Sequence, residues 1–245
     1  MAGKVHHTPE NRLLAALSSE VRERLQSDLT LVRLPLGKVI YEAHDALTHV
    51  LFPITAMVSL LYVMENGSTA EMAIVGCDGV VGIAVFMGGD TTPNRAVVQS
   101  AGSALRLSLS AFRSEFRRTG ELHRLLLLYT QALLTQMSQT AVCNQLHAVE
   151  QRLCRCLLLS HDRLDSDELI MTQELLANVL GVRREGVSVA AHRLQEMGLI
   201  RYKRGHITIL DRPGLERLAC ECYQVVKTEC DRLLPYRHSP SSFDL

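Results

Sequence analysis

Residues 172–206 constrain the fold of this chain most, because they combine two amphipathic helices, a turn and a hairpin in one order. The hydroxyl of Thr172 can cap a helix, and Gly181 follows nine residues later, where a tight turn needs positive φ. A second helix is predicted over residues 183–197, and Gly198 ends it. This pattern is typical of a helix-turn-helix, so double-stranded DNA is the first partner to consider.

The predicted second helix separates an apolar stripe from a polar face. The stripe consists of Val187, Ala190, Ala191 and Leu194. On another face, polar residues recur at steps of three or four, as Arg184, Glu185, Ser188 and His192. Such a helix can lie in the major groove, where Arg suits guanine, Glu accepts from cytosine and Ser is tolerant.

A β-hairpin is predicted after this helix. Residues 199–202 and 206–210 alternate with the period of strands around Lys203-Arg204-Gly205. A basic hairpin tip is a natural contact for phosphates, which makes the motif a winged helix-turn-helix. The alternative is an amphipathic helical hairpin in some other core, with its charges simply solvated.

Composition narrows the function classes. A length of 245 residues suits two domains, and a net charge of +0 excludes a polycation that coats nucleic acid. The lack of Trp argues against binding of single strands by base stacking. Basic residues instead gather locally, at Arg183, Arg184, Arg193, Arg201, Lys203 and Arg204. A local patch of this kind is expected of a regulatory DNA binder.

The chain shows neither an apolar signal-peptide core nor a membrane span. We therefore expect a cytoplasmic protein with no membrane partner.

The seven cysteines are expected to be thiols rather than a disulfide scaffold. Cys154 and Cys156 are two residues apart, as are Cys220 and Cys222. Residues two apart on a helix point in different directions, so neither pair makes a chelating face by itself. We expect small buried hydrophobes and assign no metal ligands; a redox or metal role is the alternative.

The first 120 residues are predicted to be β-rich. The strand candidates are residues 31–34, 39–42, 50–52, 57–64, 71–75, 95–99 and 104–109. Turn signals such as Asn66-Gly67 separate them. Roughly eight short strands with regular turns favour a jelly-roll or a small barrel.

One long helix is predicted over residues 121–144. Its apolar side chains recur at steps of three and four, as Leu122, Leu125, Leu126, Tyr129, Leu133, Met137 and Thr140. A helix this apolar must be covered on more than one side, and the barrel together with the same helix of a second copy would cover it. The sequence therefore predicts a symmetric dimer, which suits two half-sites about one DNA turn apart.

Further helices are predicted over residues 149–161 and 212–234. The chain is thus expected to be α+β, with an N-terminal β jelly-roll sensor domain, a long dimerisation helix, a C-terminal winged helix-turn-helix domain and a helical extension of unassigned function. These parts correspond to residues 1–120, 121–146, 147–213 and 214–245.

In this order of parts the chain resembles the cyclic-AMP receptor / fumarate-nitrate regulator (Crp/Fnr) family of bacterial transcription factors over nearly its whole length. The motifs that carry the likeness are Pro35-Leu36-Gly37, Gly79-Val80-Val81-Gly82, Asn94-Arg95-Ala96 and Thr172-(x)8-Gly181-Val182-Arg183-Arg184-Glu185-(x)2-Ser188. The resemblance implies a dimeric regulator that binds a palindromic operator. Its cyclic-nucleotide-binding-like domain would sense a signal and reposition the recognition helices.

The candidate DNA-binding residues are Thr172, Gln173, Arg183, Arg184, Glu185, Ser188, Val189, His192, Lys203 and Arg204. By the resemblance, Arg184, Glu185 and Ser188 match positions that touch bases. The next matching position, often Arg in the family, is Val189 here. One guanine contact is therefore lost, or replaced by apolar contact with a thymine methyl.

The candidate effector-binding residues are Gly82, Ile83, Thr91, Thr92, Arg95 and Ala96. In relatives that bind cyclic AMP, a Gly-Glu pair before the loop holds the ribose, and an Arg-Ser pair after it meets the phosphate. Here Ile83 replaces the Glu and Ala96 replaces the Ser, which argues against cyclic AMP. Arg95 could still bind another small anion; the alternative is a structural Arg paired with a carboxylate.

The N-terminus lacks the cluster-ligating cysteines of oxygen-sensing relatives, and His6 and His7 are expected to be disordered rather than ligands. No catalytic residues are assigned, because nucleophile elbow, phosphate-binding loop, His-Glu-x-x-His and Cys-x-x-Cys motifs are all absent. Two alternatives remain beside the ligand-sensing regulator. One is ligand-independent, with a degenerate pocket; the other responds through thiols, at Cys154, Cys156 or the C-terminal cysteines. An activator would also contact RNA polymerase, and activation or repression is left open.

Overall fold

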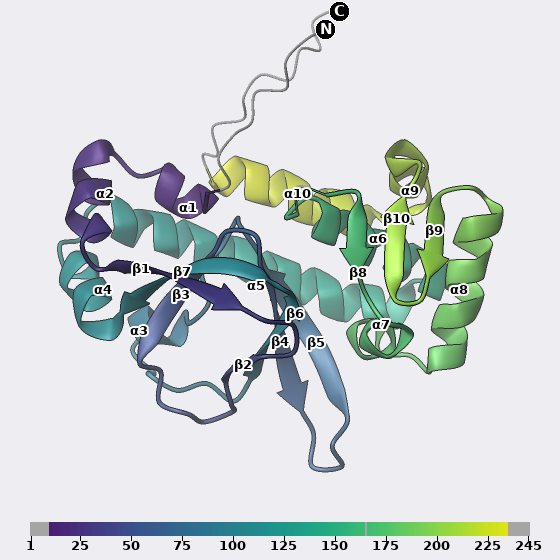
Figure 1. Cartoon of the computed structure of the whole chain (residues 1–245), viewed down its shortest axis with the longest axis horizontal. Helices are drawn as coiled ribbons and strands as arrows, with labels where there is room; N and C mark the ends of the chain where they lie inside the picture. Colours follow the sequence, from purple (N-terminus) through teal and green to yellow (C-terminus); the bar gives the residue numbers. More distant parts are fainter. Residues whose placement is uncertain (1–9, 165, 235–245) are drawn as a thin grey trace, which may run out of the picture.

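The structure is a computed structural model that describes residues 10–164 and 166–234, so His6 and His7 lie outside the described residues. Its N-terminal half contains the strands β1 (Leu29–Leu34), β2 (Val39–Tyr41), β3 (His49–Pro53), β4 (Met57–Val63), β5 (Thr69–Val75), β6 (Arg95–Ser100) and β7 (Gly102–Ser108). They form two antiparallel sheets, in the orders β1-β7-β3 and β2-β6-β4-β5 (Figure 1). The predicted β-rich N-terminal domain is confirmed.

The apolar faces of these strands supply the core of the domain. Val50, Phe52, Val58 and Leu107 are almost completely buried, as expected where two sheet faces pack together. The predicted turn between β4 and β5 is present, and Gly67 adopts a φ of 80° there, which glycine does without strain.

Four short helices border the β domain, as α1 (Arg12–Ala15), α2 (Ser19–Gln26), α3 (Ala84–Met87) and α4 (Leu109–Phe116). The side chain of Asn11 caps α1 by accepting hydrogen bonds from the N–H groups of Leu13 and Leu14. Its amide donates to the carbonyls of Pro53 and Gly79, at 2.9 Å each. The buried Asn11 therefore fixes the N-terminal helices to the sheets.

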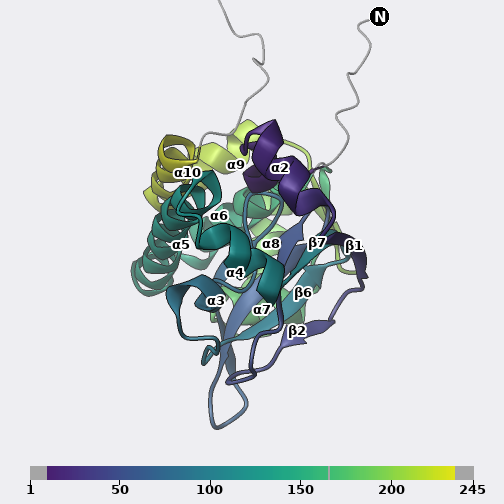
Figure 2. The same cartoon turned by 90° about the vertical axis from the view of Figure 1, so that its left-hand side faces the viewer.

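The long helix α5 (Glu121–Leu146) connects the two halves of the molecule (Figure 1). The apolar face that the sequence predicted is buried within this chain, at Leu122, Leu125, Leu126 and Leu133 among others. A second row of apolar residues remains exposed, at Leu127, Leu134, Val142 and Leu146. Figure 2 shows α5 and α10 at one side of the molecule, away from β1. Of the helices described, none has the length and apolar character to span a bilayer.

The C-terminal domain packs three helices against a small sheet. The helices are α6 (Val149–His161), α7 (Gln173–Leu180) and α8 (Arg184–Glu196). The strands β8 (Glu168–Ile170), β9 (Ile200–Lys203) and β10 (His206–Ile209) lie in the order β8-β10-β9. The predicted helices and hairpin are confirmed, whereas β8 had not been predicted, because three residues carry too little periodicity.

The C-terminal segment differs from the prediction of one helix over residues 212–234. It forms α9 (Arg212–Leu218) and α10 (Glu221–Leu233) instead. Ala219 and Cys220 between them are extended, with ψ of 152° and 163°. The break lets α10 pack along α5 and α6 of the same chain, and this tertiary packing outweighs local helix propensity.

Candidate nucleic-acid interface and effector site

The turn between α7 and α8 has the geometry predicted from the sequence. The Thr172 hydroxyl accepts a hydrogen bond from the N–H of Leu175 at 3.1 Å and caps α7. Gly181 ends α7 in the left-handed region, with φ of 60°, where a residue with a Cβ would be strained. Arg184 Nε donates to Gln173 Oε1 at 3.1 Å and so joins the first turns of the two helices.

Helix α8 packs one face on the core and turns another outward. The predicted stripe is buried, at Val187, Ala190, Ala191 and Leu194. The outward residues Arg184, Glu185, Val189 and His192 are exposed, and Ser188 is half-buried. Because Val189 is 53% exposed, an apolar side chain lies in the middle of this polar face.

The tip of the β9–β10 hairpin is a two-residue turn. Lys203 pairs with His206 as the last pair of the ladder, which leaves Arg204 and Gly205 as the turn. Their φ angles are 50° and 83°, as hairpin turns with the right-handed twist require. Lys203 and Arg204 are both exposed to solvent at this tip.

The cations of this surface lack carboxylate partners. Within residues 10–164 and 166–234, no ion pair involves Arg183, Arg184, Arg201, Lys203 or Arg204, although all five are exposed. By contrast, Arg193 farther along α8 pairs with Glu150. Unpaired, solvated cations can neutralise phosphates without first breaking an internal ion pair.

Two residues that sequence reasoning missed position the hairpin. The Tyr202 hydroxyl donates to the carbonyl of Met171 at 3.0 Å, and Gln195 Oε1 accepts from the Tyr202 N–H at 2.7 Å. These bonds tie β9 to α8 and to Met171, which precedes the N-cap of α7. Tyr202 and Met171 are 31 residues apart, so no local pattern could have identified their contact.

The predicted effector residues surround the loop between α3 and β6. Gly82 has φ of 106°, and a Cβ there would lie 3.3 Å from the Val50 side chain. Ile83 precedes α3 and is half-buried, and Ala96 is fully buried on β6. Thr91 is exposed, and the carbonyl of Thr92 accepts a hydrogen bond from the N–H of His44.

Arg95 already has a carboxylate neighbour. Its Nε lies 3.0 Å from Glu42 Oε2, and both side chains are partly exposed. This contact corresponds to the alternative in which Arg95 pairs within the protein. An anion would have to compete with Glu42 for the guanidinium.

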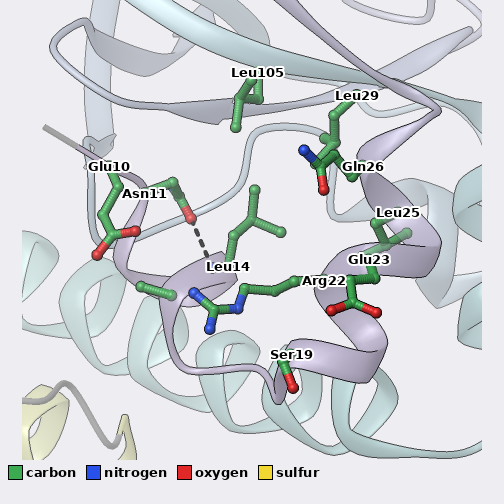
Figure 3. A pocket seen from close by; sticks show the side chains of 11 residues that line it. Glu10, Asn11, Leu14, Ser19, Arg22, Glu23, Leu25, Gln26, Leu29 and Leu105 are labelled. Atoms are coloured by element: carbon green, nitrogen blue, oxygen red, sulfur yellow. Dashed lines mark hydrogen bonds between the residues drawn. The ribbon is translucent and has the colours of Figure 1, made fainter. Parts of the chain in front are cut away.

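Two cavities in the described part of the chain are not lined by Arg95. One of about 350 Å³ lies between α1, α2 and the sheet, where Leu14 and Leu105 point toward each other beside Arg22 (Figure 3). A smaller one of about 80 Å³ lies beside Tyr41 and Leu47. Pockets for drug-sized ligands have volumes of roughly 300–1,000 Å³, so the first of these two cavities has such a size and the second does not.

Five of the seven cysteines fall into two groups. Cys154 and Cys156 are buried in the C-terminal core, and burial raises the pKa of each thiol to about 12. Since the thiolate is the reactive form, these two behave as the small hydrophobes predicted. Cys143, Cys220 and Cys222 instead form a separate buried cluster, which His147 adjoins.

The cluster of Cys143, Cys220 and Cys222 with His147 was not predicted, because no metal ligands were assigned from the sequence. The pattern of Cys143 and His147, four residues apart at the end of α5, was an available signal. The other half of the group comes from a segment about 75 residues away, and only the tertiary structure unites the halves.

Comparison with known proteins identifies both domains. The profile of the cyclic nucleotide-binding domain matches residues 31–119, and that of the Crp-like helix-turn-helix domain matches residues 151–218. Together these matches cover more than half of the chain. No curated protein is similar enough in sequence to match it.

Solved structures share the whole arrangement. FixK2 from Bradyrhizobium japonicum is 18% identical, with a TM-score of 0.68, over 78% of this chain and 98% of that one. The c-di-GMP-responsive global regulator CLP from Xanthomonas campestris is 16% identical, with a TM-score of 0.60, over 79% and 100%. A CRP/FNR-family transcriptional regulator from Thermus thermophilus is 20% identical, with a TM-score of 0.58, over 78% and 98%.

The structural likeness to these proteins establishes a common fold. The two profile matches establish which domains compose it. Both domains occur in this chain, and the long helix α5 connects them. The family consists of transcription regulators rather than enzymes. The chain belongs to the Crp/Fnr family of DNA-binding transcription regulators.

Proposed function

We propose that this regulator acts as a homodimer that reads a two-fold-symmetric operator through α8 and the β9–β10 hairpin. The observation that carries the proposal is the outward face of α8 beside the hairpin tip, where exposed cations without carboxylate partners adjoin side chains able to read bases. An α-helix fits the major groove, and a basic hairpin tip can reach the flanking phosphates.

Each exposed residue of α8 suits a particular contact. Arg184 can donate to guanine O6 and N7, and Glu185 can accept from cytosine N4. Val189 offers a methyl surface to thymine, which fits its exposure in the middle of the face. The operator half-site should therefore contain both a G·C pair and an A·T pair.

The dimer is supported by the exposed side of α5. Leu127, Leu134 and Ala141 follow one another at seven-residue spacing, and all three are exposed. This is the spacing of a coiled-coil seam. A second copy of α5 would cover Leu127 and Leu134, which are 53% and 56% exposed, and would place two α8 helices for half-sites about 34–36 Å apart.

The signal would arise in the N-terminal domain and reach α8 through α5. A small anion at Arg95 stays a prediction, and it would have to displace Glu42. Cyclic AMP is not the ligand we expect, because the half-buried Ile83 offers no carboxylate to a ribose.

The test is selection of bound sequences from random duplex DNA by the purified protein, followed by affinity measurements on the selected site. We expect a two-fold-symmetric motif. Arg184→Ala should weaken specific binding by about 1–3 kcal/mol and relax the base preference at one position of each half-site. Arg193→Ala, which changes an arginine of the same helix that pairs with Glu150, is the matched control. Motif-free binding, or equal losses in both variants, would contradict the assignment of the face.

A further inference from the structure

Four potential metal ligands converge at the junction of α5, α6 and α10. Cys143 lies in the last turn of α5, and His147 is the residue that ends that helix. Cys220 caps α10, and Cys222 lies in its first turn. One ligand atom from each residue lies within 4.8 Å of all the others.

The distances fit one tetrahedral ion. Cys143 Sγ lies 3.4 Å from Cys220 Sγ, and Cys222 Sγ lies 3.6 Å from His147 Nδ1. Thiolate sulfur at about 2.3 Å and imidazole nitrogen at about 2.0–2.1 Å from zinc place tetrahedral ligand atoms roughly 3.5–3.8 Å apart. The cysteine sulfurs are thus close enough to share an ion without rearrangement of the backbone.

The surroundings of His147 favour ligation through Nδ1. Its Nε2 lies 3.4 Å from Glu221 Oε1. A carboxylate that accepts the other ring N–H fixes the tautomer and orientation of a ligating histidine. Glu221 is exposed, so it can serve this purpose without cost to the core.

Two buried arginines near the cluster favour a negatively charged metal site. Arg152 and Arg155 are 6% and 4% exposed, and neither forms an ion pair in the part of the chain that the structure describes. The Nε atom of each lacks a hydrogen-bond partner there. Arg155 Nη1 donates to the hydroxyl of Thr140 at 3.2 Å, one turn of α5 before Cys143, so its guanidinium lies beside the end of α5 that carries the cluster.

Buried cations of this kind need a counter-charge. Three thiolates and one divalent ion carry a net charge of −1, which would supply it. The N-terminus of α10 adds a partial positive charge beside Cys220 and Cys222 and thereby favours their thiolate forms.

We propose that Cys143, His147, Cys220 and Cys222 bind one zinc ion, with sulfur from the three cysteines and Nδ1 from the histidine. On binding, the thiols release their protons to solvent. Sulfur and nitrogen in a tetrahedral set are typical of zinc, and a closed set of four protein ligands is typical of a structural site.

The ion would act as a clamp on the joint that orients the DNA-binding domain. His147 and Ala148 are the extended residues between α5 and α6. The ion would tie this joint to the start of α10, which packs along α5. Loss of the ion would free the joint and reduce operator affinity, and this consequence rests on the proposed function, whereas the metal site itself does not.

The first experiment measures metal in the full-length protein by mass spectrometry, as purified and after chelation and reloading with Zn²⁺. We expect one zinc per chain. Loading with Co²⁺ should produce the absorption bands of tetrahedral thiolate-bound cobalt. Stoichiometric iron with acid-labile sulfide, a Cys143–Cys220 disulfide in the native protein, or no retained ion would each overturn the proposal.

Variants test the ligand set. Cys220→Ser and His147→Ala should lower the affinity for Zn²⁺ at least tenfold, while Cys230→Ser, on the same helix outside the cluster, should retain it. Glu221→Gln changes an exposed residue and is expected to leave the fold intact. It therefore separates metal binding from folding, with an expected loss of Zn²⁺ affinity of about 10–100-fold. Zn²⁺ affinity that is unchanged in Glu221→Gln and Cys220→Ser would contradict the site.

Operator affinity of the chelated and reloaded protein tests the clamp separately. We expect at least a tenfold gain on reloading. One zinc per chain with unchanged operator affinity would contradict the clamp and leave the site standing. A zinc-loaded protein that binds DNA without sequence preference would instead contradict the proposed function.

Discussion

Arg163 Nη2 lies 2.8 Å from Asp78 Oδ2, and this ion pair joins the C-terminal domain to the N-terminal domain. Both side chains are largely buried, at 5% and 13% exposure. Arg163 also donates to Gln136 of α5 at 3.0 Å and to the carbonyl of Leu159 in α6 at 2.8 Å. One guanidinium thus links the β domain, the long helix and the DNA-binding domain, so a change in one can be transmitted to the others.

Removing the carboxylate of this pair should destabilise the protein. Asp78→Asn leaves the Arg163 charge buried without its ion-pair partner, and we expect the free energy of unfolding to fall by about 3 kcal/mol. Denaturant unfolding measures the loss. The control is Glu20→Gln, which breaks the solvent-exposed contact with Arg24 and should cost less than about 0.5 kcal/mol. Similar losses in both variants would contradict the importance of burial at Asp78.

The hairpin tip should contribute affinity without sequence preference. Lys203→Ala should weaken binding to the selected operator and to random DNA by similar factors, because a phosphate contact does not distinguish bases. In a dimer two such contacts are lost, so the slope of log affinity against log salt should fall by roughly 2. Titrations at several salt concentrations measure this slope. The control is Lys227→Ala, on α10 and paired with Asp231, which should leave the slope unchanged. A slope that is the same in Lys203→Ala and in the native protein would show that the hairpin does not contact DNA.

The exposed side of α5 should hold the dimer together. In a dimer, Leu134→Asp places one carboxylate from each copy in the proposed interface between the two α5 helices. We expect the dimer dissociation constant to rise at least about 100-fold. Sedimentation velocity measures the oligomeric state across concentrations. Leu31→Asp, at an apolar residue of β1 that is 65% exposed, is the matched control. A Leu134→Asp protein that remains as dimeric as the control would place the dimer interface elsewhere.

A buried glutamate should make stability depend on pH. Burial raises the pKa of Glu71 from its ordinary 4.5 to about 7, against the attraction of Arg155 and Arg163. The folded state therefore favours the protonated carboxyl of Glu71. The contribution of this carboxyl to the free energy of unfolding is fully present below about pH 4.5 and is lost as the pH rises through 7. The difference between the ordinary and the raised pKa of Glu71 corresponds to about 3 kcal/mol of stability at most, at 1.36 kcal/mol for each pKa unit.

Glu71→Gln, which cannot ionise, should remove this dependence. Relative to the native protein, the variant should gain about 2–3 kcal/mol in the free energy of unfolding between pH 5 and pH 8. Glu65→Gln, at an exposed position of the same hairpin, should show no such gain. An identical difference between Glu71→Gln and the native protein at both pH values would show that Glu71 does not titrate in this range.

The sequence by itself determined the features whose chemistry is local. The Thr172 cap, the left-handed Gly181 and the buried stripe from Val187 to Leu194 follow from side chains within one or two helical turns. The strands of the β domain likewise follow from alternation and turn residues, since each is defined by its own neighbours. For the same reason the buried and exposed faces of α8 could be predicted from the sequence.

Only the tertiary structure decided what depends on segments far apart in the chain. The break at Ala219 and Cys220 exists because α10 packs back along α5, and no glycine or proline marks it in the sequence. The pairing of Arg95 with Glu42, the link from Arg163 to Asp78, and the meeting of Cys143 with Cys220 all join residues at least 50 positions apart. Local periodicity carries no record of such contacts, because they are set by how whole faces of helices and sheets pack together.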